Sequence, residues 1–510
     1  MYLRTVCFQT SKKQSSKAKG KVARVPFSES SVNADRVNER TIEQIYQKKT
    51  QLEHILLRPD TYIGSVETRT QALWVYNEDN PEKFVNKVIN YVPGLFKIFD
   101  EIVVNAADNY RRDPTMNKFE VAIDEVSGSI KVWNNGSGIP VELHKDERVY
   151  VPELIFGHLL TSSNYDDNEK KITGGRNGFG AKLSNIFSKE FIIETADGSR
   201  GQKYRQVFRN NMQDKSEPEI KPCKSKDNWT CLTFTPDFEK FGMTHLDADI
   251  VALMKKRAFD VAGCLGKHVK CYLNGEQIKI RSFQDYCSMY LLDDSATRIY
   301  EKISDRWEVL ITSSDGQFQQ VSFVNSINTI KGGTHVGCLA DQIVQKILPI
   351  ISKRVKGHTL KPFQLKNQMW LFVNSLIENP AFDSQCKETL NTLASKFGSK
   401  PQLSDEFLKK VSKSPIVDRI IDFASLKQAA ELKKTDGAKR SKLSGIPKLD
   451  DANQAGGRSS KDCTLILTEG DSAKALAVSG LSVVGRDKYG VFPLRGKLLN
   501  VREGSHEQVI

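Results

Sequence analysis

The sequence lacks the patterns of disulfide-rich, zinc-binding and membrane-spanning proteins. Its nine cysteines include no C-x-x-C pair and their number is odd, so neither a disulfide framework nor a structural zinc site is expected. The eight histidines include no H-E-x-x-H motif and no pair four residues apart, which leaves His-ligated metal chemistry without support. No run of about 18 apolar residues occurs, so no transmembrane helix is expected. This cysteine usage fits a reducing intracellular compartment.

The composition that is present is that of a globular chain. The 510 residues, at about 100 to 200 residues per domain, predict roughly three domains. Apolar residues make up 39% and charged residues 27%, which excludes a wholly disordered or collagen-like chain. The net charge of +13 favours a polyanionic partner such as nucleic acid, although it would also serve solubility alone.

Residues 1–40 have the character of a basic, disordered tail. From Lys12 to Arg24 every charged residue is basic, among Ser, Gln, Gly and Ala, and such a stretch has too few apolar residues to fold. Three interpretations stay open: a nuclear-localisation or nucleic-acid-binding arm, a transit peptide, and a solvated tail without a partner.

Periodicity predicts a mixed α/β layout with helices on one face of a largely antiparallel sheet. Leu95, Phe99, Ile102 and Ala106 repeat at helical spacing, which predicts a helix over 95–111. Expected strands of this first region lie at 119–123 and 130–133, joined by a turn at Ser127-Gly128, and at 191–195, 204–208 and 231–234.

A second region, from about residue 276, has expected strands at 321–325 and 370–373 and expected helices at 338–352 and 404–430. Residues 431–461 are polar and rich in Lys, Gly and Asp, as is typical of a linker. An apolar strand is expected at 463–468, followed by Glu469-Gly470-Asp471-Ser472 and a helical Ala/Leu pattern to Gly480.

The first candidate site is Glu101, followed at helical spacing by Asn105, Asp108 and Asn109. On a helix these residues share one face, which borders the apolar stripe, so the Glu101 carboxylate is expected to be partly desolvated. Partial burial would raise the pKa of Glu101 towards the range of a general base, and the Asn105 oxygen suits a hard cation such as Mg²⁺. The alternative is an amphipathic helix whose polar face simply meets water.

Two glycine-rich segments follow this helix. In residues 134–138 (NNGSG), glycines let the backbone approach a ligand and an Asn could hydrogen-bond a purine amine, although Asn-Gly is also a common turn. Residues 174–182 run into an apolar helix from Leu183, and glycines before a helix present N–H groups to phosphate. This segment matches neither the P-loop nor the dinucleotide fingerprint, and the alternative is a flexible surface loop.

The three motifs, in this order, resemble the ATPase fold shared by gyrase, a heat-shock chaperone, histidine kinases and a mismatch-repair protein. Longer strings resemble the eukaryotic type II DNA topoisomerases, over about residues 41–510. The strings that carry this resemblance are Gln51–Ser65, Leu160–Asp167, Ile446–Asn453, Leu467–Lys474 and Pro493–Val501.

The resemblance implies an α/β (α+β) chain of several parts. After the tail of residues 1–40, an ATPase sandwich of the gyrase, heat-shock chaperone, histidine kinase and mismatch-repair type would occupy residues 41–275. A ribosomal-S5-like transducer would occupy residues 276–430. After the linker at 431–461, the truncated start of a Toprim domain would occupy residues 462–510.

The same resemblance implies roles for individual residues. Glu101 would be the general base that activates the water attacking the γ-phosphate, Asn105 would bind Mg²⁺ and nucleotide, and Asn134 would lie on the adenine side, where many relatives carry Asp. The family's Gln-Thr-Lys loop appears here as Gln385-Cys386-Lys387, and Lys387 would reach the γ-phosphate. The other residues implied to bind nucleotide are Asn109, Ser162, Ser163, Asn164, Gly175, Arg176, Asn177, Gly178, Phe179, Gly180, Ala181, Lys182 and Thr233.

For DNA, the resemblance implies contacts at Lys353 and Arg354, where Ser352 stands in place of a third basic residue. Glu469 would be one Mg²⁺ ligand of the Toprim domain, and Lys497 and Asn500 match positions that touch DNA. The family's remaining metal-binding aspartates and its DNA-cleaving tyrosine would lie beyond the last residue, so no DNA cleavage is expected of this chain alone.

The implied parent activity is ATP-dependent passage of one DNA duplex through another, which controls supercoiling, decatenation and chromosome segregation. ATP and Mg²⁺ are the expected cofactors, and a homodimer acting on double-stranded DNA in the nucleus is expected, with no membrane and no small-molecule substrate other than ATP. A chaperone- or mismatch-repair-type ATPase is an alternative, against which the strings around Glu469 and over 493–500 argue. A non-catalytic DNA-binding fragment is another, against which Glu101, Asn105 and Lys387 argue.

Overall fold

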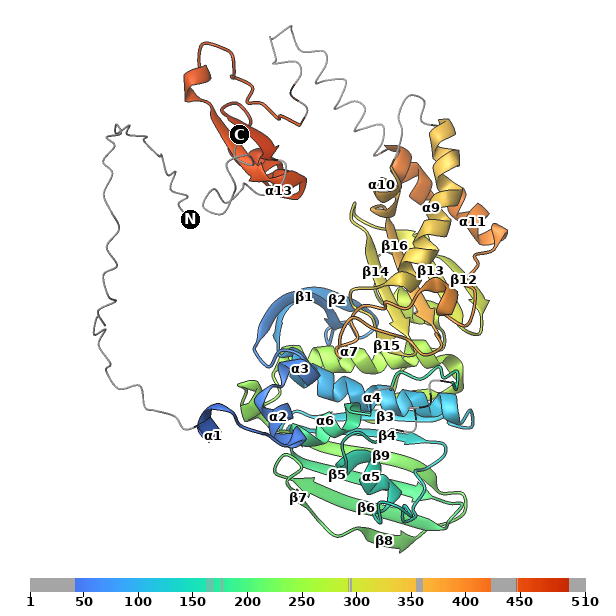
Figure 1. Ribbon diagram of the computed structural model, residues 1–510. Helices are drawn as coiled ribbons and strands as arrows, with labels where there is room; N and C mark the ends of the chain where they lie inside the picture. Colours follow the sequence, from blue (N-terminus) through green and yellow to red (C-terminus); the bar gives the residue numbers. More distant parts are fainter. Residues whose placement is uncertain are drawn as a thin grey trace, which may run out of the picture. The chain divides into compact units, whose positions relative to one another are not determined.

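The computed structural model describes residues 42–162, 164, 166, 168–175, 178–291, 293, 296–354, 361–422, 446 and 448–494 (Figure 1). The expected tail at 1–40 lies outside the described residues. Residues 42–58 carry two short helices, α1 (Ile42–Ile45) and α2 (Gln51–Leu57), and belong to a unit separate from residues 59–510. No helix in the described ranges has both the length and the apolar composition to cross a membrane.

A nine-stranded sheet forms the larger layer of the first region, with the strand order β11-β10-β3-β4-β9-β5-β6-β7 and β8 paired to β6. Of its strand pairs only β10 and β3 run parallel, so the expected largely antiparallel sheet is confirmed. The strands are β3 (Lys118–Asp124), β4 (Ser129–Asn135), β5 (Ser188–Asp197), β6 (Gln202–Arg209), β7 (Asp214–Lys215), β8 (Glu219–Pro222), β9 (Asn228–Pro236), β10 (Lys270–Leu273) and β11 (Glu276–Gln277).

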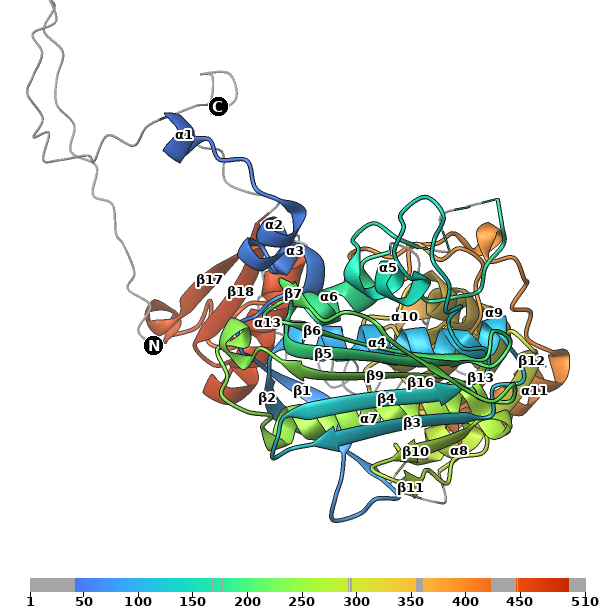
Figure 2. The same cartoon turned by 90° about the horizontal axis from the view of Figure 1, so that it is seen from below.

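Helices cover one face of this sheet, as expected, with α4 (Pro93–Arg112) and α7 (Ala248–Leu265) behind the strands in Figure 2. Burial alternates along β3, where Phe119 and Val121 are fully buried and their neighbours are partly exposed, because successive side chains point to opposite faces. The predicted helix over 95–111 is confirmed, and it begins at Pro93 because proline is favoured in a first helical turn.

The other helices of this region are short. They are α3 (Asp60–Ile63), α5 (Val151–Gly157), α6 (Gly180–Ile186), α8 (Phe283–Ser288) and the 3-10 helices η1 (Phe238–Phe241) and η2 (Gly266–His268). A separate hairpin consists of β1 (Arg69–Tyr76) and β2 (Phe84–Tyr91).

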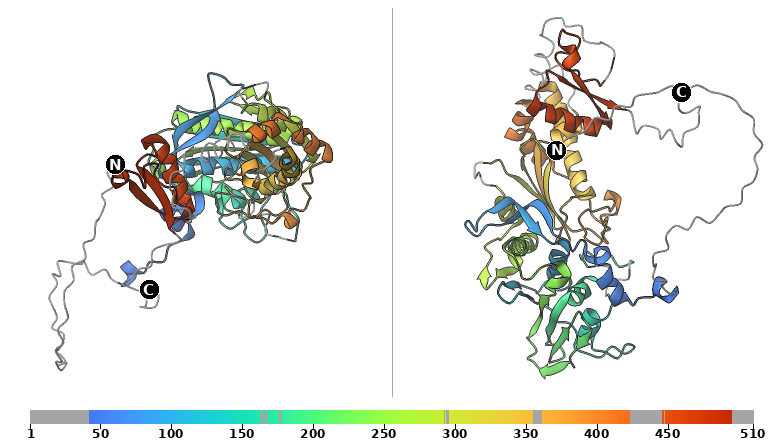
Figure 3. Two further views of the ribbon diagram at one scale, coloured as in Figure 1. Left: turned by 90° about the horizontal axis from the view of Figure 1, so that it is seen from above. Right: turned by 90° about the vertical axis from the view of Figure 1, so that its left-hand side faces the viewer.

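A five-stranded sheet, of order β12-β13-β16-β14-β15, organises the second region. Its central strand β16 (Met369–Ser375) is buried at every residue because both faces are covered. One face packs against α9 (Thr334–Arg354), and the other packs Trp370 and Phe372 against α8, the end of α7 and Phe84 of the hairpin. Figure 3 shows this sheet with α9. The other elements are β12 (Ile299–Ser304), β13 (Trp307–Ser313), β14 (Gln319–Val324), β15 (Ile327–Asn328), α10 (Pro362–Lys366), η3 (Ala394–Lys396) and α11 (Asp405–Ser412).

The strands and the helix expected at 321–325, 370–373 and 338–352 are confirmed. The helical stretch expected around 404–430 is confirmed in its described part, with one break: α11 ends at Ser412 and helical structure resumes at Pro415. Proline restricts the preceding residue to non-helical conformations, which accounts for the break. Residues 423–430 lie outside the described part of the chain.

The last described segment contains β17 (Thr464–Glu469), α13 (Gly470–Val484) and β18 (Tyr489–Leu494), with the two strands parallel. The strand expected at 463–468 is confirmed, and the helix runs four residues past the expected end at Gly480. The segment begins within the expected linker, because Asp450 pairs with Val491 of β18 and η4 (Ser460–Asp462) precedes β17.

Candidate active site

Helix α4 carries Glu101 in the interior of the protein, where its side chain is only 3% exposed. Two ammonium groups flank the carboxylate: Lys97 Nζ at 2.6 Å and Lys387 Nζ at 3.1 Å, both measured to Oε1. Burial pushes the pKa of Glu101 upward, but attraction to Lys387 and Lys97 outweighs it and lowers the pKa to about 2. The expectation of a raised pKa is therefore wrong, because it was based on burial alone.

Lys387 reaches this helix from a loop far along the chain. The residue has a positive φ of 61°, and its side chain is 6% exposed. The backbone anchors the loop on both sides of Lys387. Before it, Lys387 N donates to Ser384 O at 3.1 Å, and after it Lys331 N donates to Glu388 O at 3.0 Å. An unfavourable backbone conformation held by such anchors indicates a position fixed by its surroundings.

The glycine segment lies across the polar face of α4. Gly174 N donates to Asp108 Oδ1 at 2.8 Å and Gly175 N to Asp108 Oδ2 at 2.9 Å. Burial raises the pKa of the Asp108 carboxyl. Asn164 Nδ2 donates to Gly175 O at 2.6 Å. The start of the glycine segment is therefore bonded both to α4 and to Asn164.

Two glycines of this segment approach α4 closely. A Cβ added to Gly175 would lie 3.1 Å from Asn105 Oδ1, and a Cβ added to Gly180 would lie 2.0 Å from Glu101 Oε2. The second distance is an overlap of atoms, so a side chain at residue 180 would force the Glu101 carboxylate or the start of α6 to move. Gly178 adopts a positive φ of 70°. Arg176 and Asn177 lie outside the described residues.

Lys182 of α6 is buried, and its Nζ donates a hydrogen bond to Thr161 O. Burial lowers the pKa of Lys182 to about 8, because desolvation disfavours the charged form. Next to Thr161, Ser162 Oγ accepts a bond from Asn164 N at 3.1 Å. Ala181 is buried and Phe179 contacts the Tyr62 ring, with centroids 5.9 Å apart. Ser163 falls outside the described residues.

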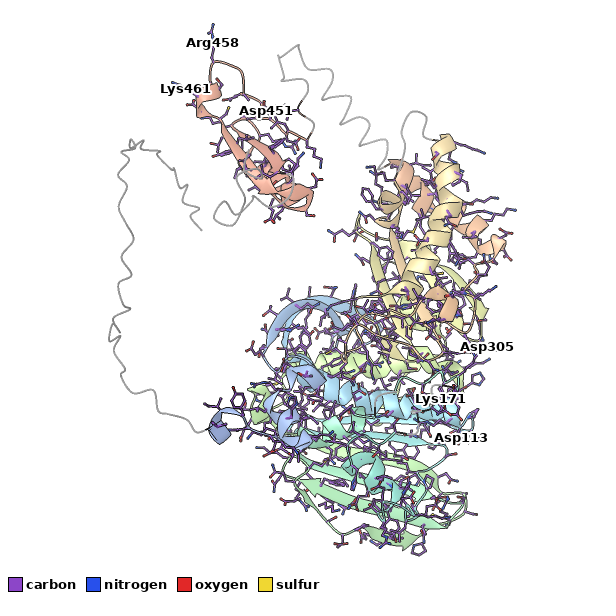
Figure 4. The ribbon with its side chains drawn as sticks, viewed as in Figure 1. Asp113, Lys171, Asp305, Asp451, Arg458 and Lys461 are labelled. Atoms are coloured by element: carbon purple, nitrogen blue, oxygen red, sulfur yellow. The ribbon has the colours of Figure 1, made fainter. Side chains whose placement is uncertain are left out.

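The second glycine turn closes the opposite end of the α4 face. Asn109 Nδ2 donates to Asn135 O at 3.2 Å, and Asp113, at the end of α4, accepts from Ser137 N at 2.6 Å; Asp113 is labelled in Figure 4. A Cβ at Gly138 would lie 1.9 Å from Ala196 O, so this turn also depends on glycine. The turn is therefore hydrogen-bonded to the last turn and the C-cap of α4.

Asn134 is the last buried residue of β4, and the strand register identifies its neighbours. It pairs with Thr230 of β9, which pairs in turn with Thr195 of β5, and the two threonine hydroxyls are 3.1 Å apart. Thr233 is three residues from Thr230, so it points to the opposite face of the sheet, where it pairs with exposed Lys131. The geometry thus favours Thr230 over Thr233 beside Asn134.

The remaining predicted residues lie in the loop that carries Lys387, at the ends of α9 and β17, or outside the described residues. Cys386 is half-buried with its pKa raised by burial, and its Sγ would be 2.9 Å from a Cβ at Gly64. Gln385 precedes it in the same loop. Lys353 and Arg354 are exposed in the last turn of α9, and Glu469 is exposed at the end of β17. Lys497 and Asn500 are not among the described residues.

Sequence reasoning missed three groups at this site. Lys97 could have been found, because it precedes Glu101 by four residues on the same helix, the spacing of an ion pair. Thr230 is named only by strand register. Asn325, whose side chain donates to Thr173 O at 3.1 Å beside the glycine segment, has no signal in the sequence.

Two family models match the chain. The model described as "Histidine kinase-, DNA gyrase B-, and HSP90-like ATPase" matches residues 90–240, and the model described as "DNA gyrase B" matches residues 276–439. The first match spans α4, both glycine segments and the strands that carry Asn134 and Thr230. The second spans the five-stranded sheet and Lys387.

Curated relatives and solved structures extend the match. The chain is 61% identical over 484 residues to DNA topoisomerase 2 of Pisum sativum, covering 94% of this chain and 33% of the relative. It is 56% identical over 486 residues to DNA topoisomerase 2-alpha of Homo sapiens, covering 94% and 32%. The chain thus spans about a third of the length of these curated relatives.

Among solved structures, the ATPase region of Saccharomyces cerevisiae topoisomerase II aligns with a TM-score of 0.71 at 52% identity, over 75% of this chain and 99% of that one. The ATPase and transducer domains of DNA topoisomerase II from Balamuthia mandrillaris align with a TM-score of 0.73 at 49% identity, over 76% and 100%.

Proposed function

Because this chain belongs to the type II DNA topoisomerase family and carries its ATPase region, we propose that it hydrolyses ATP at the polar face of α4. The observation that carries this proposal is the buried Glu101 carboxylate between Lys97 and Lys387, directly under the glycine segment. A buried carboxylate held by two lysines beside a backbone that admits no side chains suits an anionic substrate and a water molecule.

The residues present fit a nucleoside triphosphate. Gly175 and Gly180 leave the space that side chains would otherwise fill next to Asn105 and Glu101, which lets backbone N–H groups approach phosphate oxygens. Lys182 and Lys387 supply cations at the same segment. At the other end, Asn134 and Thr230 offer a carboxamide and a hydroxyl to a base, and we assign the adenine side to this pair.

Glu101 acts in this proposal as the base that orients and deprotonates the attacking water. With its pKa near 2 the carboxylate is ionised at neutral pH but is a weak base. A γ-phosphate bound next to Lys387 would draw that ammonium from Glu101, because the phosphate carries more negative charge. The loss of one of two cations raises the basicity of Glu101. The base would therefore be strengthened only when the nucleotide is in place.

Asn105 is the protein group that we propose as a ligand of Mg²⁺, through its side-chain oxygen. Magnesium is usually held by one or two protein oxygens together with substrate phosphates, and the described residues contain no group of three or more His, Cys, Asp or Glu residues that could hold a metal by themselves. When bound, the ion would neutralise charge on the phosphates. We propose Glu101 as the base and Lys387 as the γ-phosphate contact independently of this ion.

The decisive experiment compares Glu101→Gln with the wild type in steady-state ATP hydrolysis and in binding of a non-hydrolysable ATP analogue. We expect hydrolysis to fall by on the order of 10²- to 10⁴-fold, the usual contribution of a general base, while the analogue still binds. Glu190→Gln is the matched control, since Glu190 is half-buried in the first sheet and pairs with Arg209 at 3.0 Å, and it should keep the wild-type rate. Hydrolysis at the wild-type rate in Glu101→Gln would contradict the assignment.

The chain spans about a third of the length of its curated relatives, and for the whole activity of the family we propose ATP-dependent passage of one DNA duplex through another. In this scheme the chain is the ATP-operated clamp, which dimerises when nucleotide binds and works in the nucleus. Lys353 and Arg354 are proposed contacts to DNA phosphates, and Glu469 a metal ligand in the Toprim segment. Lys497, Asn500, Ser163, Arg176 and Asn177 keep their proposed ligand contacts on resemblance alone.

A further inference from the structure

The turn between β14 and β15 is buried, although turns normally lie at the surface. Asn325 and Ser326 form it with φ values of 51° and 63°, and they are 1% and 3% exposed. Positive φ at both central residues is the type I′ hairpin geometry, which asparagine tolerates better than most residues. The burial means that this turn is in contact with other parts of the protein.

One set of contacts runs to the segment that leads into the glycine loop. Asn325 Nδ2 donates to Thr173 O at 3.1 Å, and Asn379 N donates to Lys171 O at 2.9 Å; Lys171 is labelled in Figure 4. Gly174, which follows Thr173, donates its N–H to Asp108 of α4. The peptide unit between Thr173 and Gly174 is therefore bonded to the second region through its carbonyl oxygen and to α4 through its N–H.

The same asparagine also holds the chain that leads to Lys387. Asn325 Nδ2 donates to Ile377 O at 2.9 Å, and Asn325 Oδ1 accepts from Ile377 N at 2.8 Å. The backbone of Asn325 donates to Ser375 O at 2.9 Å. One carboxamide thus joins the glycine segment to the start of the loop that carries Lys387, with both its oxygen and its nitrogen in use.

The other half of the turn reaches the helix that carries Glu101. Arg257 Nη2 donates to Ser326 O at 2.6 Å, and Arg257 Nε donates to Asp100 Oδ1 at 2.6 Å. Arg257 is fully buried, and Asp100 directly precedes Glu101 on α4. A guanidinium that bonds both ends in this way sets the distance between the turn and α4.

We propose that the Asn325-Ser326 turn is a positioning element for ATP hydrolysis, which sets the glycine segment, α4 and the Lys387 loop in register from the second region. Asn325 is its principal positioning residue, and Arg257 is the second. This inference rests on the proposed ATPase function. It differs from the Lys387 contact in that neither residue touches the proposed reacting groups, so loss of the turn should slow the chemical step and leave nucleotide affinity largely intact.

The test is Asn325→Gly, which keeps the positive φ and removes the carboxamide. The matched control is Asn274→Gly, since Asn274 has a φ of 49° and a side-chain oxygen that accepts from Ile123 N at 2.8 Å, in the turn between β10 and β11. We expect kcat for ATP to fall by on the order of 10- to 100-fold in Asn325→Gly, as for misplaced reacting groups, with KM changed less than about threefold. Asn274→Gly should keep the wild-type kcat.

A second readout does not depend on hydrolysis. In hydrogen exchange of the nucleotide-free chain, peptides covering 171–175 and 384–390 should exchange faster in Asn325→Gly than in the wild type, and not in Asn274→Gly. Unchanged exchange at both peptides, or a kcat equal to that of the control variant, would overturn the inference. Failure of the proposed function would give a different result: the wild type would not hydrolyse ATP, or Glu101→Gln would hydrolyse it at the normal rate. In that case hydrogen exchange would still test whether the turn positions the two segments.

Asn325→Asp separates positioning from folding. The aspartate keeps the shape and tolerates positive φ, but its oxygens would face Thr173 O and Ile377 O, which need a donor. We expect a kcat at least as low as that of Asn325→Gly. Arg257→Lys keeps the charge and one of the two bonds, so its kcat should lie between that of the wild type and those of the two Asn325 variants. Full activity of Asn325→Asp would also overturn the inference.

Discussion

Lys387 Nζ lies 3.1 Å from Glu101 Oε1, although the two residues are 286 positions apart in the chain. One comes from the helix under the first sheet and the other from a loop of the second region, so the ion pair joins the two. Both side chains are almost completely buried, and in such surroundings a charge that loses its partner is costly. This contact explains why the Glu101 carboxylate is held ionised.

Replacing Lys387 by methionine tests this relationship. Hydrolysis should fall by on the order of 10²- to 10³-fold, the usual cost of removing a group that stabilises transition-state charge. The pKa of Glu101 in the free enzyme should also rise from its value near 2, because only Lys97 remains to favour the carboxylate, so the acid limb of the pH profile of kcat/KM moves to higher pH. Lys331→Met is the control, since Lys331 is exposed and pairs with Glu388; equal losses in both variants would refute a specific role.

Gly180→Ala should damage the same site by steric overlap. The new methyl group would lie 2.0 Å from Glu101 Oε2, so the carboxylate or the start of α6 must move, and a displacement of about 1 Å can cost on the order of 10²-fold in rate. Gly337→Ala in α9 is the matched control, because nothing lies within 4 Å of its added Cβ. That variant should be neutral or more stable by up to about 1 kcal/mol. Steady-state hydrolysis and thermal unfolding of both variants provide the measurement.

Stability should depend on acid through His335, which is fully buried and has a pKa lowered by burial from 6.5 to about 3. The His335 imidazole takes up a proton below pH 6.5 in the unfolded chain, but only below about pH 3 in the folded chain. Its contribution to the free energy of unfolding is therefore fully present above pH 6.5 and is lost as the pH falls below that value. The slope is at most about 1.4 kcal/mol per pH unit.

The variant His335→Gln should show a smaller loss of thermal stability between pH 7 and pH 5 than the wild type does. Exposed His245 provides the control, and His245→Gln should retain the full pH dependence. If His335→Gln and the wild type lose the same stability over this range, His335 does not cause the acid sensitivity.

The elements of both sheets could be predicted from the sequence where periodicity was strong. The helix at 95–111 and the strands at 119–123 and 370–373 follow from apolar spacing, and the break before Pro415 follows from proline chemistry. The helical stretch expected around 404–430 did not include this break, because apolar spacing was weighed without that proline. Strand order could not be derived, since local pattern does not say which strands pair across the chain.

The candidate site divides in the same way. Glu101 and the glycines are recognisable by motif, because their chemistry is local to one helix and one loop. Thr230 and Asn325 are not, since their positions depend on register and on a turn from the other region. The direction of the Glu101 pKa shift was missed because it depends on Lys387, whose proximity only the folded chain creates, and on Lys97, whose spacing on the helix was not weighed.

DNA contact by the end of α9 is expected to show itself in salt dependence. Lys353 and Arg354 are exposed in the last turn of that helix, and Arg354 is only loosely paired, at 3.8 Å from Asp418, so both cations are available to phosphates. Each phosphate contact contributes about 0.9 to the slope of log K against log salt concentration. The double variant Lys353→Ala/Arg354→Ala should therefore reduce the magnitude of that slope by nearly two in duplex binding titrations.

The control is the double variant Lys189→Ala/Arg209→Ala, which removes the same charge from residues of the first sheet that are already paired with acidic groups. A slope reduced equally by both variants would mean that net charge, and not contact at α9, sets the affinity.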